Sequence, residues 1–230
     1  MILTRRKLHP MTEVIAVMTY NQPEMVWALM QELSPYLLVI DNGSTVPIPN
    51  TRIRVPENRY FAGGWNYAMQ QIDADWVAML NDDITGITVG MISDLIDTAI
   101  AHDYAAISPA FNSPHPHMQP QGKGLRRVHS IDWVATIVRK KAWDDVGGFN
   151  EAFPGYGSDL EWAYRAKQKG YRLAVDDRYC IHHIGGAAAI AGGTQHIQGN
   201  VTSMNEAFNR LYSVPDWMAF TQQYLMKDFS

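Results

Sequence analysis

Short apolar runs followed by polar residues recur along the chain. Residues 77–80 form the clearest of these runs, and Asn81, Asp82 and Asp83 follow it directly. An apolar run this short, with polar residues on both sides, is typical of a strand that is buried on both faces of a sheet. The same kind of pattern predicts strands at residues 13–20, 37–40, 53–55, 133–138, 172–175 and 179–182.

Longer amphipathic segments between these runs predict helices. Pro23 opens the first of them, since proline is tolerated in the first turn of a helix. Ser158 and Glu161 have the spacing of a capping box at the start of another helix, and Gly170 suits its end. The predicted helices are residues 24–33, 65–72, 89–101, 140–146, 158–169, 205–212 and 215–227.

Three segments lack a regular pattern. Residues 58–64 are predicted to form a glycine-containing loop. Prolines in residues 108–130 exclude regular structure, and a loop of this length is usually functional or disordered. Residues 185–193 consist of Gly, Ala and Ile, and we expect them to form a mobile flap.

The alternation of strands and helices predicts an α/β fold. Residues 13–20, 24–33 and 37–40 have the spacing of a βαβ unit, which places two parallel strands in one sheet. We therefore expect a mostly parallel central sheet flanked by helices. The 230 residues are enough for a single domain with a sizeable core. Residues 1–11 are expected to be a loose extension of this domain, and residues 187–230 a C-terminal flap and helices.

Composition and charge narrow the functional classes. The formal net charge of -4 gives no overall attraction to nucleic acid or acidic lipid. Basic clusters at residues 5–7, 126–127 and 139–141 could contact anions locally, although such clusters are usually solvated surface. Cys180 is the only cysteine, which excludes an internal disulfide and a cysteine-based zinc site and fits a reducing compartment. No apolar run approaches the ~20 residues of a membrane span, so we expect a cytoplasmic protein and leave peripheral membrane contact open.

Polar clusters follow three of the predicted strands. In an open α/β sheet, ligands bind beyond the carboxyl ends of the strands, so these clusters predict a nucleotide pocket. Asp82 and Asp83 supply oxygen ligands that suit Mg²⁺ or Mn²⁺. The alternative is that these aspartates only form a turn or cap a helix, and a tight turn is an equal alternative for Asp41. The clusters are Thr19-Tyr20-Asn21, Asp41-Asn42-Gly43-Ser44 and Asn81-Asp82-Asp83.

Two glycines, Gly63 and Gly64, are expected to lie just before the helix at residues 65–72. Backbone amides at that position could approach a phosphate or a sugar closely. The segment lacks the G-x-G-x-x-G spacing of a dinucleotide fingerprint, and residues 122–124 lack the Ser or Thr of a P-loop. A Rossmann dehydrogenase and a P-loop kinase are therefore disfavoured.

The order of these motifs resembles that of family 2 glycosyltransferases, and rhamnosyltransferase-like members in particular. Each matching segment is short, but the order and spacing of the segments agree over most of the chain. The resemblance implies the GT-A fold, in which one α/β domain binds a nucleotide-sugar. The matching segments are residues 14–21, 41–44, 58–66, 80–83, 146–151, 157–159 and 183–186.

The resemblance also implies roles for individual residues. Asp83 matches the last carboxylate of the D-x-D element and His183 a histidine near the metal, so both are expected to bind Mn²⁺ or Mg²⁺. Asp159 matches the general base that takes the proton of the acceptor hydroxyl in inverting members. Asn81 stands where the D-x-D element often has aspartate, and Ser158 where a glutamate often precedes the base. The implied donor-binding residues are Thr19, Tyr20, Asn21, Asp41, Asn58, Gly64, Asn66 and Asp82.

Several of these residues also have simpler interpretations. The macrodipole stabilises an acidic residue such as Asp159 at a helix start, and a histidine such as His183 at a strand end is more often an ordinary hydrogen-bonding residue. His115 and His117 have no partner at ligand spacing, and we predict that they are plain loop residues. Trp162 lies in the middle of a predicted helix, where packing is expected rather than stacking on a sugar.

The sequence therefore predicts a metal-dependent glycosyltransferase that moves a sugar from a nucleotide-diphosphate sugar to an acceptor hydroxyl with inversion. A nucleotidyltransferase, which would release pyrophosphate, is one alternative. A non-catalytic nucleotide-binding or sugar-binding module is another. A glycan or another hydroxyl-bearing molecule is the expected acceptor, while a nucleic acid acceptor is left open but not favoured. The pattern selects neither the donor sugar nor its nucleotide.

Overall fold

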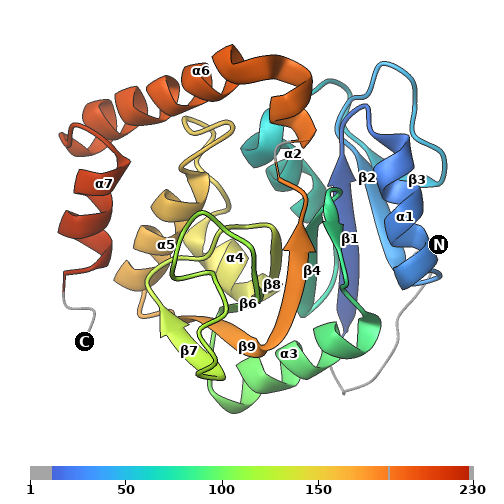
Figure 1. Cartoon of the computed structure of the whole chain (residues 1–230), viewed down its shortest axis with the longest axis horizontal. Helices are drawn as coiled ribbons and strands as arrows, with labels where there is room; N and C mark the ends of the chain where they lie inside the picture. The colour runs from blue at the N-terminus through green and yellow to red at the C-terminus, as the bar shows by residue number, and fades with distance from the viewer. Residues whose placement is uncertain (1–11, 186, 228–230) are drawn as a thin grey trace.

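A central sheet with helices around it forms the body of the protein (Figure 1). The computed structural model describes residues 12–185 and 187–227, and for residues 187–199 it describes the backbone only. The loose extension predicted at residues 1–11 lies outside the described residues.

Strands of the central sheet run mostly in one direction. Ile15 of β1 lies opposite Leu37 of β2 on one side and Ala78 of β4 on the other, and both pairings are parallel. β8 runs against both of its neighbours, β4 and β6, and β9 is again parallel to β6. The predicted fold class is confirmed. The strand order is β3 (Thr51–Arg54), β2 (Leu37–Asp41), β1 (Glu13–Thr19), β4 (Trp76–Asn81), β8 (Ala135–Arg139), β6 (Ala106–Phe111), β9 (Leu173–His183) and β5 (Ile84–Thr85), and β7 (Leu125–Val128) also pairs with β9.

The helices at residues 23–33, 89–101, 140–146 and 158–168 agree with the predicted segments to within a residue at either end. The helix at residues 60–69 begins inside the loop predicted at residues 58–64, and residues 187–212 form one helix where only 205–212 were predicted. Figure 1 shows α6 lying across the end of the sheet toward which the arrow of β9 points. Among the described residues, no helix is long and apolar enough to cross a membrane. The helices are α1 (Pro23–Leu33), α2 (Tyr60–Met69), α3 (Val89–Ala101), α4 (Lys140–Val146), α5 (Ser158–Gln168), α6 (Ala187–Tyr212) and α7 (Trp217–Phe220), followed by the π-helix η1 (Thr221–Leu225).

The central strands are buried on both faces. Each residue from Val77 to Leu80 in β4 is no more than 1% exposed, and Ala16 and Val17 in β1 are fully buried. This burial explains why the sequences of these strands are continuous apolar runs and do not alternate between apolar and polar residues. The polar residues that follow each run therefore mark the points where the chain leaves the core.

A group of buried aromatic rings holds α4 and α5 against the segment before β8. The ring of Trp133 lies 5.0 Å from that of Trp162 in α5 and 4.8 Å from that of Phe149, and Phe149 also lies 4.8 Å from Trp143 in α4. Trp162 is fully buried, as predicted. Since Asp159 lies one turn before Trp162, this packing fixes the start of α5 relative to the sheet.

Two irregular segments of the sequence contain strands. Residues 106–111 form β6 although Pro109 lies within it, because the pairing with β9 shifts register between Pro109 and Ala110 and the missing amide is accommodated there. Residues 125–128 form β7. The prediction that prolines exclude regular structure from residues 108–130 is therefore wrong at both ends of that segment. β9 also replaces the two short strands predicted at residues 172–175 and 179–182.

Other local predictions are wrong at the ends of helices. Gly157, with a φ of +87°, precedes α5 as its N-cap residue, so Ser158 lies inside the helix and no capping box forms. Glu161 instead pairs with Arg165, at 2.8 Å. Gly170 does end the helix, with a φ of +80°. The predicted flap is the start of α6 from Ala187 onward, while residue 186 lies outside the described residues.

Candidate functional site

Asp83 and His183 come together at the carboxyl edge of the sheet. β5 pairs with the end of β9 and places Ile84 opposite His183. The Nε2 atom of His183 lies 3.1 Å from Oδ1 of Asp83. The side chain of Asn112 accepts from the amide of His183 at 2.7 Å and donates to its carbonyl at 2.9 Å. The two predicted metal ligands are therefore adjacent, and backbone pairing holds them in place.

Asp82 is desolvated beside this pair. Burial raises the pKa of Asp82 to about 6, a hydrogen bond from the Thr19 hydroxyl works against the rise, and the charge of Asp83 adds to it. Thr19 is the last residue of β1 and is only 2% exposed. The carboxyl ends of β1 and β4 thus meet at Asp82, which is the arrangement that the strand-end pattern predicted.

Asp41 is fully buried at the end of β2, and its oxygens already have partners. Oδ1 accepts from the amide of Ser44 at 2.8 Å, and Oδ2 accepts from the amide of Ile48 at 3.2 Å and from the guanidinium of Arg54. In this arrangement Asp41 organises the loop after β2. It presents no free oxygen surface to a nucleotide.

The turn after β1 is joined to the same loop. Asn21 has a φ of +57°, its amide donates to the Ser44 hydroxyl at 2.9 Å, and its Oδ1 accepts from the amide of Thr45 at 2.9 Å. Tyr20, the preceding residue, is 43% exposed. Of these two predicted donor-binding residues, Tyr20 has an exposed side chain that can contact a ligand. The backbone amide and Oδ1 of Asn21 are already hydrogen-bonded within the turn.

Asn42 and Asn58 form a clamp around the first residue of α2. Asn42 Nδ2 donates to Asn58 Oδ1 at 3.2 Å and to the carbonyl of Tyr60 at 2.9 Å, and Asn58 Oδ1 accepts from the amide of Tyr60 at 2.8 Å. Tyr60 adopts a φ of +56° within this clamp and is 57% exposed. Asn58 therefore shapes the loop and the helix start at the edge where a donor is expected.

Gly63 and Gly64 lie within α2, so the prediction that they precede the helix is wrong. Gly64 is past the first turn, whose amides alone are free to bind a phosphate. A Cβ atom at Gly64 would lie 2.6 Å from Sδ of Met18 and 2.8 Å from Oδ1 of Asn42. The absence of a side chain is what lets α2 pack closely on the ends of β1 and β2.

Asn66 joins α2 to the turn after α4. Its Oδ1 accepts from the amide of Phe149 at 2.8 Å, and its Nδ2 donates to the carbonyl of Phe149 at 2.9 Å and to Glu151 at 3.0 Å. The opposite end of the Glu151 carboxylate lies 3.3 Å from the guanidinium of Arg59. Asn66 therefore joins two segments beside the site. Its side-chain oxygen and nitrogen already have hydrogen-bond partners in the protein.

Asp159 lies in the first turn of α5 and is partly buried. Burial raises the pKa of Asp159 to about 6, and the charge of Asp132 adds to the rise. The amide of Leu160, which donates to Asp159 Oδ1 at 2.9 Å, and the charge of His115 both oppose it. A carboxylate with a pKa near 6 is ionised at neutral pH and is a better proton acceptor than an ordinary aspartate.

Asp132 and His115 form a pair that the sequence did not reveal. His115 Nδ1 lies 2.9 Å from Asp132 Oδ2, and the Ser113 hydroxyl donates to the same oxygen at 2.8 Å. The hydrogen bond to Asp132 raises the pKa of His115. Burial opposes ionisation of Asp132, but its bonds and charges from the histidine side outweigh burial and lower its pKa. The prediction that His115 has no partner is wrong.

The segment just before β8 contacts the end of β4. Leu80 at the end of β4 pairs with Ala135 of β8, and the amide of Asn81 donates to the carbonyl of Val134 at 2.9 Å. The segment that carries Asp132 therefore starts beside the predicted D-x-D element. The charge of Asp132 in turn raises the pKa of Asp159 at the start of α5.

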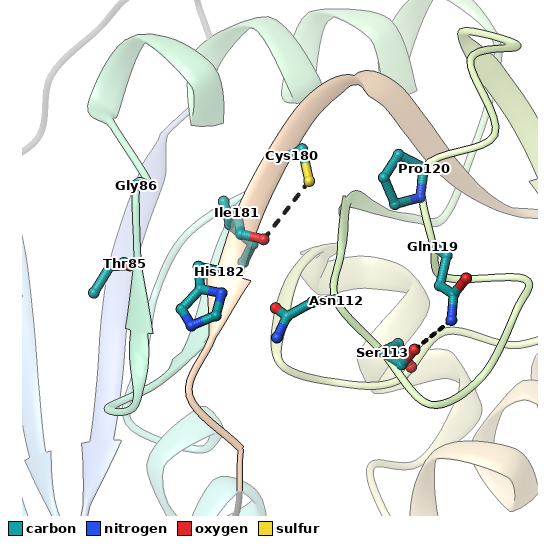
Figure 2. A pocket seen from close by; sticks show the side chains of 9 residues that line it. All are labelled: Thr85, Gly86, Asn112, Ser113, Gln119, Pro120, Cys180, Ile181 and His182. Atoms are coloured by element: carbon teal, nitrogen blue, oxygen red, sulfur yellow. Dashed lines mark hydrogen bonds between the residues drawn. The ribbon is translucent and has the colours of Figure 1, made fainter.

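A cavity of about 740 Å³ opens beside β9 (Figure 2). Cys180 and His182 line it from the strand, and Asn112, Ser113 and Gln119 line it from the segment after β6. Side chains alternate along a strand, so His182 faces this cavity while His183 faces Asp83. The cavity thus lies on the other face of β9 from the Asp83–His183 pair, and none of the predicted site residues lines it.

No protein family model matches the sequence. Uncharacterized proteins of Mycobacterium tuberculosis and Mycobacterium bovis are 27% identical to this chain over 233 aligned positions. The alignment covers 91% of this chain and 89% of each relative. The similarity therefore extends over most of both chains, and the names of these relatives assign no activity.

Several solved structures share its architecture. A mannosyltransferase, PcManGT from Pyrobaculum calidifontis in complex with GDP-Man and Mn²⁺, has a TM-score of 0.65 at 14% identity, over 90% of this chain and 66% of that one. S. aureus TarS, residues 1–349, gives 0.58 at 15% identity, over 87% and 72%. GalNAc-T7 with UDP, GalNAc and Mn²⁺ gives 0.58 at 11% identity, over 75% and 44%. The chain has the GT-A fold. It spans less than half the length of GalNAc-T7 and about two thirds of the mannosyltransferase.

The edge of this GT-A sheet offers a donor set that fits a divalent cation. Asp83 and His183 provide one oxygen and one nitrogen ligand 3.1 Å apart, and the desolvated carboxylate of Asp82 adds negative charge beside them. Within the described residues, no group of three His, Cys, Asp or Glu side chains is arranged to hold a metal. An ion held by one or two side chains and completed by substrate phosphates is the usual arrangement for Mg²⁺, so the residues suit an ion that binds together with a diphosphate.

Proposed function

We propose that this protein is a metal-dependent glycosyltransferase that transfers a sugar from a nucleotide-diphosphate sugar to an acceptor hydroxyl with inversion. One observation carries the proposal. Asp83 and His183 meet at the carboxyl edge of a GT-A sheet, 3.1 Å apart. Asp159, in the first turn of α5, supports the proposal with a pKa that burial raises to about 6. Ligands of open α/β sheets bind at this edge.

Donor binding is assigned to the strand ends. Asp83 and His183 would hold the cation against the diphosphate, and Asp82, at the junction of β1 and β4, would face the ribose or the cation. Tyr20 and Tyr60 are exposed at the same edge and are the side chains free to contact a nucleotide. The solved structures that contain UDP or GDP-Man together with Mn²⁺ support a nucleotide-sugar donor and a divalent metal.

The remaining predicted donor residues act on the shape of the site. Asp41 and Asn21 hold the loop after β2, and Asn58 holds the start of α2. Asn66 ties α2 to the turn after α4, and Gly64 allows α2 to approach the strand ends. We therefore assign these five residues to positioning rather than to direct contact with the donor.

Asp159 is assigned as the general base. The acceptor hydroxyl gives its proton to the Asp159 carboxylate while its oxygen bonds to the anomeric carbon and the nucleoside diphosphate leaves with the electrons of the bond that breaks. Attack from the side opposite the leaving group inverts the anomeric centre. A bound divalent ion would neutralise the charge that develops on the leaving phosphates. A pKa of about 6 leaves Asp159 ionised at neutral pH and ready to accept this proton.

A thermal-shift screen of nucleotide-sugars with and without Mn²⁺ tests the proposal, followed by an assay of nucleoside diphosphate release with the ligand that stabilises most. We expect a metal-dependent shift for one nucleotide class and release of the matching diphosphate. His102 is an exposed residue just after α3. The control substitution His102→Ala should leave the thermal shift and the diphosphate release unchanged. Absence of any metal-dependent shift, or release of pyrophosphate from a nucleoside triphosphate instead, would contradict the proposal.

A further inference from the structure

Ser113, His115 and Asp132 form a closed set of hydrogen bonds that the donor chemistry does not use. The Ser113 hydroxyl accepts from the amide of His115 at 2.9 Å and donates to Asp132 Oδ2 at 2.8 Å, while His115 Nδ1 lies 2.9 Å from the same carboxylate oxygen. Asp132 is nearly buried, with a side-chain exposure of 15%, whereas the His115 side chain is 44% exposed. The carboxylate therefore holds a solvent-facing imidazole in one orientation.

The exposed imidazole lies beside an aromatic ring from the C-terminal part of the chain. The ring centroids of His115 and Trp217 are 5.9 Å apart. Trp217 is the first residue of α7, and its amide donates to Asn205 Oδ1 in α6 at 3.2 Å. Segments separated by about half of the chain thus meet here, and each contributes a partly exposed ring.

The same imidazole and carboxylate are close enough to Asp159 to affect its ionisation. Trp133, the neighbour of Asp132, packs with its ring 5.0 Å from that of Trp162, one turn along α5 from Asp159. His115 and Trp217 therefore lie near the start of α5, which carries the proposed base. Asp132 and Asp159 carry two negative charges against one on the imidazole when it is protonated. A phosphate-bearing or other polyanionic molecule would be repelled at this place, whereas neutral hydroxyl groups would find both donors and acceptors.

We propose that His115 and Trp217 form a subsite for a neutral pyranoside acceptor and that Asp132 is the positioning residue of this subsite. The proposal rests on the glycosyltransferase function proposed above. Because Nδ1 donates to the Asp132 carboxylate, Nε2 accepts from a sugar hydroxyl when the imidazole is neutral and donates to a sugar oxygen when it is protonated. The indole of Trp217 covers an apolar face of the sugar. Binding in this way directs another hydroxyl of the same sugar toward Asp159.

Steady-state kinetics of the full chain test the subsite, with the best nucleotide-sugar from the screen as donor and a panel of p-nitrophenyl pyranosides as acceptors. For His115→Ala we expect KM for the acceptor to rise about tenfold or more, while the affinity for the donor nucleoside diphosphate with Mn²⁺ stays within about twofold. Asp132→Asn should raise the same KM because the imidazole loses its orientation. Trp217→Ala should raise the acceptor KM as well. Trp217→Phe, which keeps an aromatic ring, should raise it much less.

His102→Ala is the matched control, since it removes an exposed imidazole at the end of α3 and should alter neither KM nor kcat. Circular dichroism melts check that each variant is folded, and His115→Gln replaces His115→Ala if the latter is unfolded. An unchanged acceptor KM in the folded His115 variant overturns the subsite. Donor hydrolysis by the wild-type protein without transfer to any pyranoside overturns the acceptor class. Absence of nucleoside diphosphate release from every donor refutes the glycosyltransferase function itself, and the subsite with it.

Discussion

Burial at Asp159 makes the proposed base a source of instability at neutral pH. Its pKa is raised from 3.8 to about 6, first by burial and then by the charge of Asp132. A carboxyl group whose pKa is higher in the folded protein than in the unfolded chain favours folding when protonated. Its ionisation therefore costs stability progressively between about pH 4 and pH 6, and the full cost applies at pH 7.

Asp159→Asn should accordingly separate activity from stability. We expect sugar transfer to fall by at least about 100-fold, since a general base contributes ~10²–10⁴-fold. The free energy of unfolding at pH 7 should rise by about 1 kcal/mol. This value is smaller than the free energy that corresponds to the full pKa shift, because the side chain is partly exposed and solvent screens its charge. Urea unfolding at pH 7 and at pH 4 measures this, and the gain should vanish at the lower pH. Equal stability of both proteins at pH 7 would contradict the burial argument.

The pH dependence of transfer follows from the same group. With the base active only when ionised, kcat/KM for the wild-type protein should rise with pH and level off above an apparent pKa near 6. The residual rate of Asp159→Asn should lack this acidic limb. Initial rates from pH 4.5 to pH 8 at saturating Mn²⁺ provide the measurement. An acidic limb that persists unchanged in the variant would assign it to another residue.

At the scale of elements, α2 depends on a close approach to the ends of β1 and β2. Gly64→Ala places a methyl group 2.6 Å from Sδ of Met18 and 2.8 Å from Oδ1 of Asn42. We expect a loss of about 1–3 kcal/mol in the free energy of unfolding, the usual cost of overpacking, together with weaker donor binding because Asn42 holds the helix start. Urea denaturation and nucleotide titration measure the two effects.

Gly90→Ala in α3 is a matched control for this substitution. A Cβ atom at Gly90 would meet only Oγ1 of Thr88, at 3.9 Å, so the new methyl group has room. Alanine has the better helix propensity, and we expect this variant to gain up to about 1 kcal/mol. Equal effects of the two substitutions would show that close packing at Gly64 is not the cause.

Arg165 fixes α5 against the turn after α4. Its guanidinium pairs with Glu161 at 2.8 Å and donates to the carbonyls of Val146 and Gly148. The hydroxyl of Tyr212 in α6 also donates to Glu161, at 2.7 Å. The position of Asp159, two residues before Glu161 on the same helix, therefore depends on contacts from both α6 and the turn after α4.

Arg165→Met should destabilise the fold more than Tyr212→Phe. The first variant leaves the buried Glu161 carboxylate without its cation, for which we expect a loss of about 3–5 kcal/mol. The second removes a single hydrogen bond to the same carboxylate, with a loss of about 1.5–3 kcal/mol. Urea unfolding midpoints compare the two variants. A smaller loss for Arg165→Met than for Tyr212→Phe would remove Arg165 from this role.

At the scale of the whole molecule, the proposed metal is needed for the ligand and not for the fold. The core around β1 and β4 consists of apolar residues. Asp83 and His183 lie at its edge. EDTA alone should therefore leave the unfolding midpoint unchanged. It should abolish the stabilisation by a nucleoside diphosphate, which is expected to reach about 2.7 kcal/mol at 100 times Kd. Differential scanning fluorimetry checks both, and a large shift from EDTA alone would indicate a structural metal.

Asp83→Asn provides the corresponding test in the protein. It should remove the Mn²⁺-dependent stabilisation by nucleoside diphosphate, because the amide replaces the charged ligand, while leaving the fold intact. Asp97→Asn, on α3, is a carboxylate control with the same change of charge. Metal-dependent stabilisation that survives in Asp83→Asn and equals that of the control would remove Asp83 from the metal site.

Several elements could be predicted from the sequence because their signals are local. β4 is an apolar run that ends at Asn81, and the helices α1, α3 and α4 follow the amphipathic pattern to within a residue at either end. β6 escaped prediction because Pro109 breaks the local pattern, and only the register shift against β9 makes a strand there favourable. The glycines of α2 were misplaced for a similar reason, since their close packing on β1 and β2 is not visible in the chain.

The alternating α/β pattern and the acidic residues that follow β4 can be recognised in the sequence, because apolar periodicity and strand-end polarity are properties of neighbouring residues. Which of these groups meet depends on how distant segments of the chain fold together. The pairing of β5 with β9 brings His183 to Asp83, and the folding of the segment after β6 brings His115 to Asp132. Burial then changes the chemistry of Asp159, since desolvation depends on what surrounds a carboxylate in space.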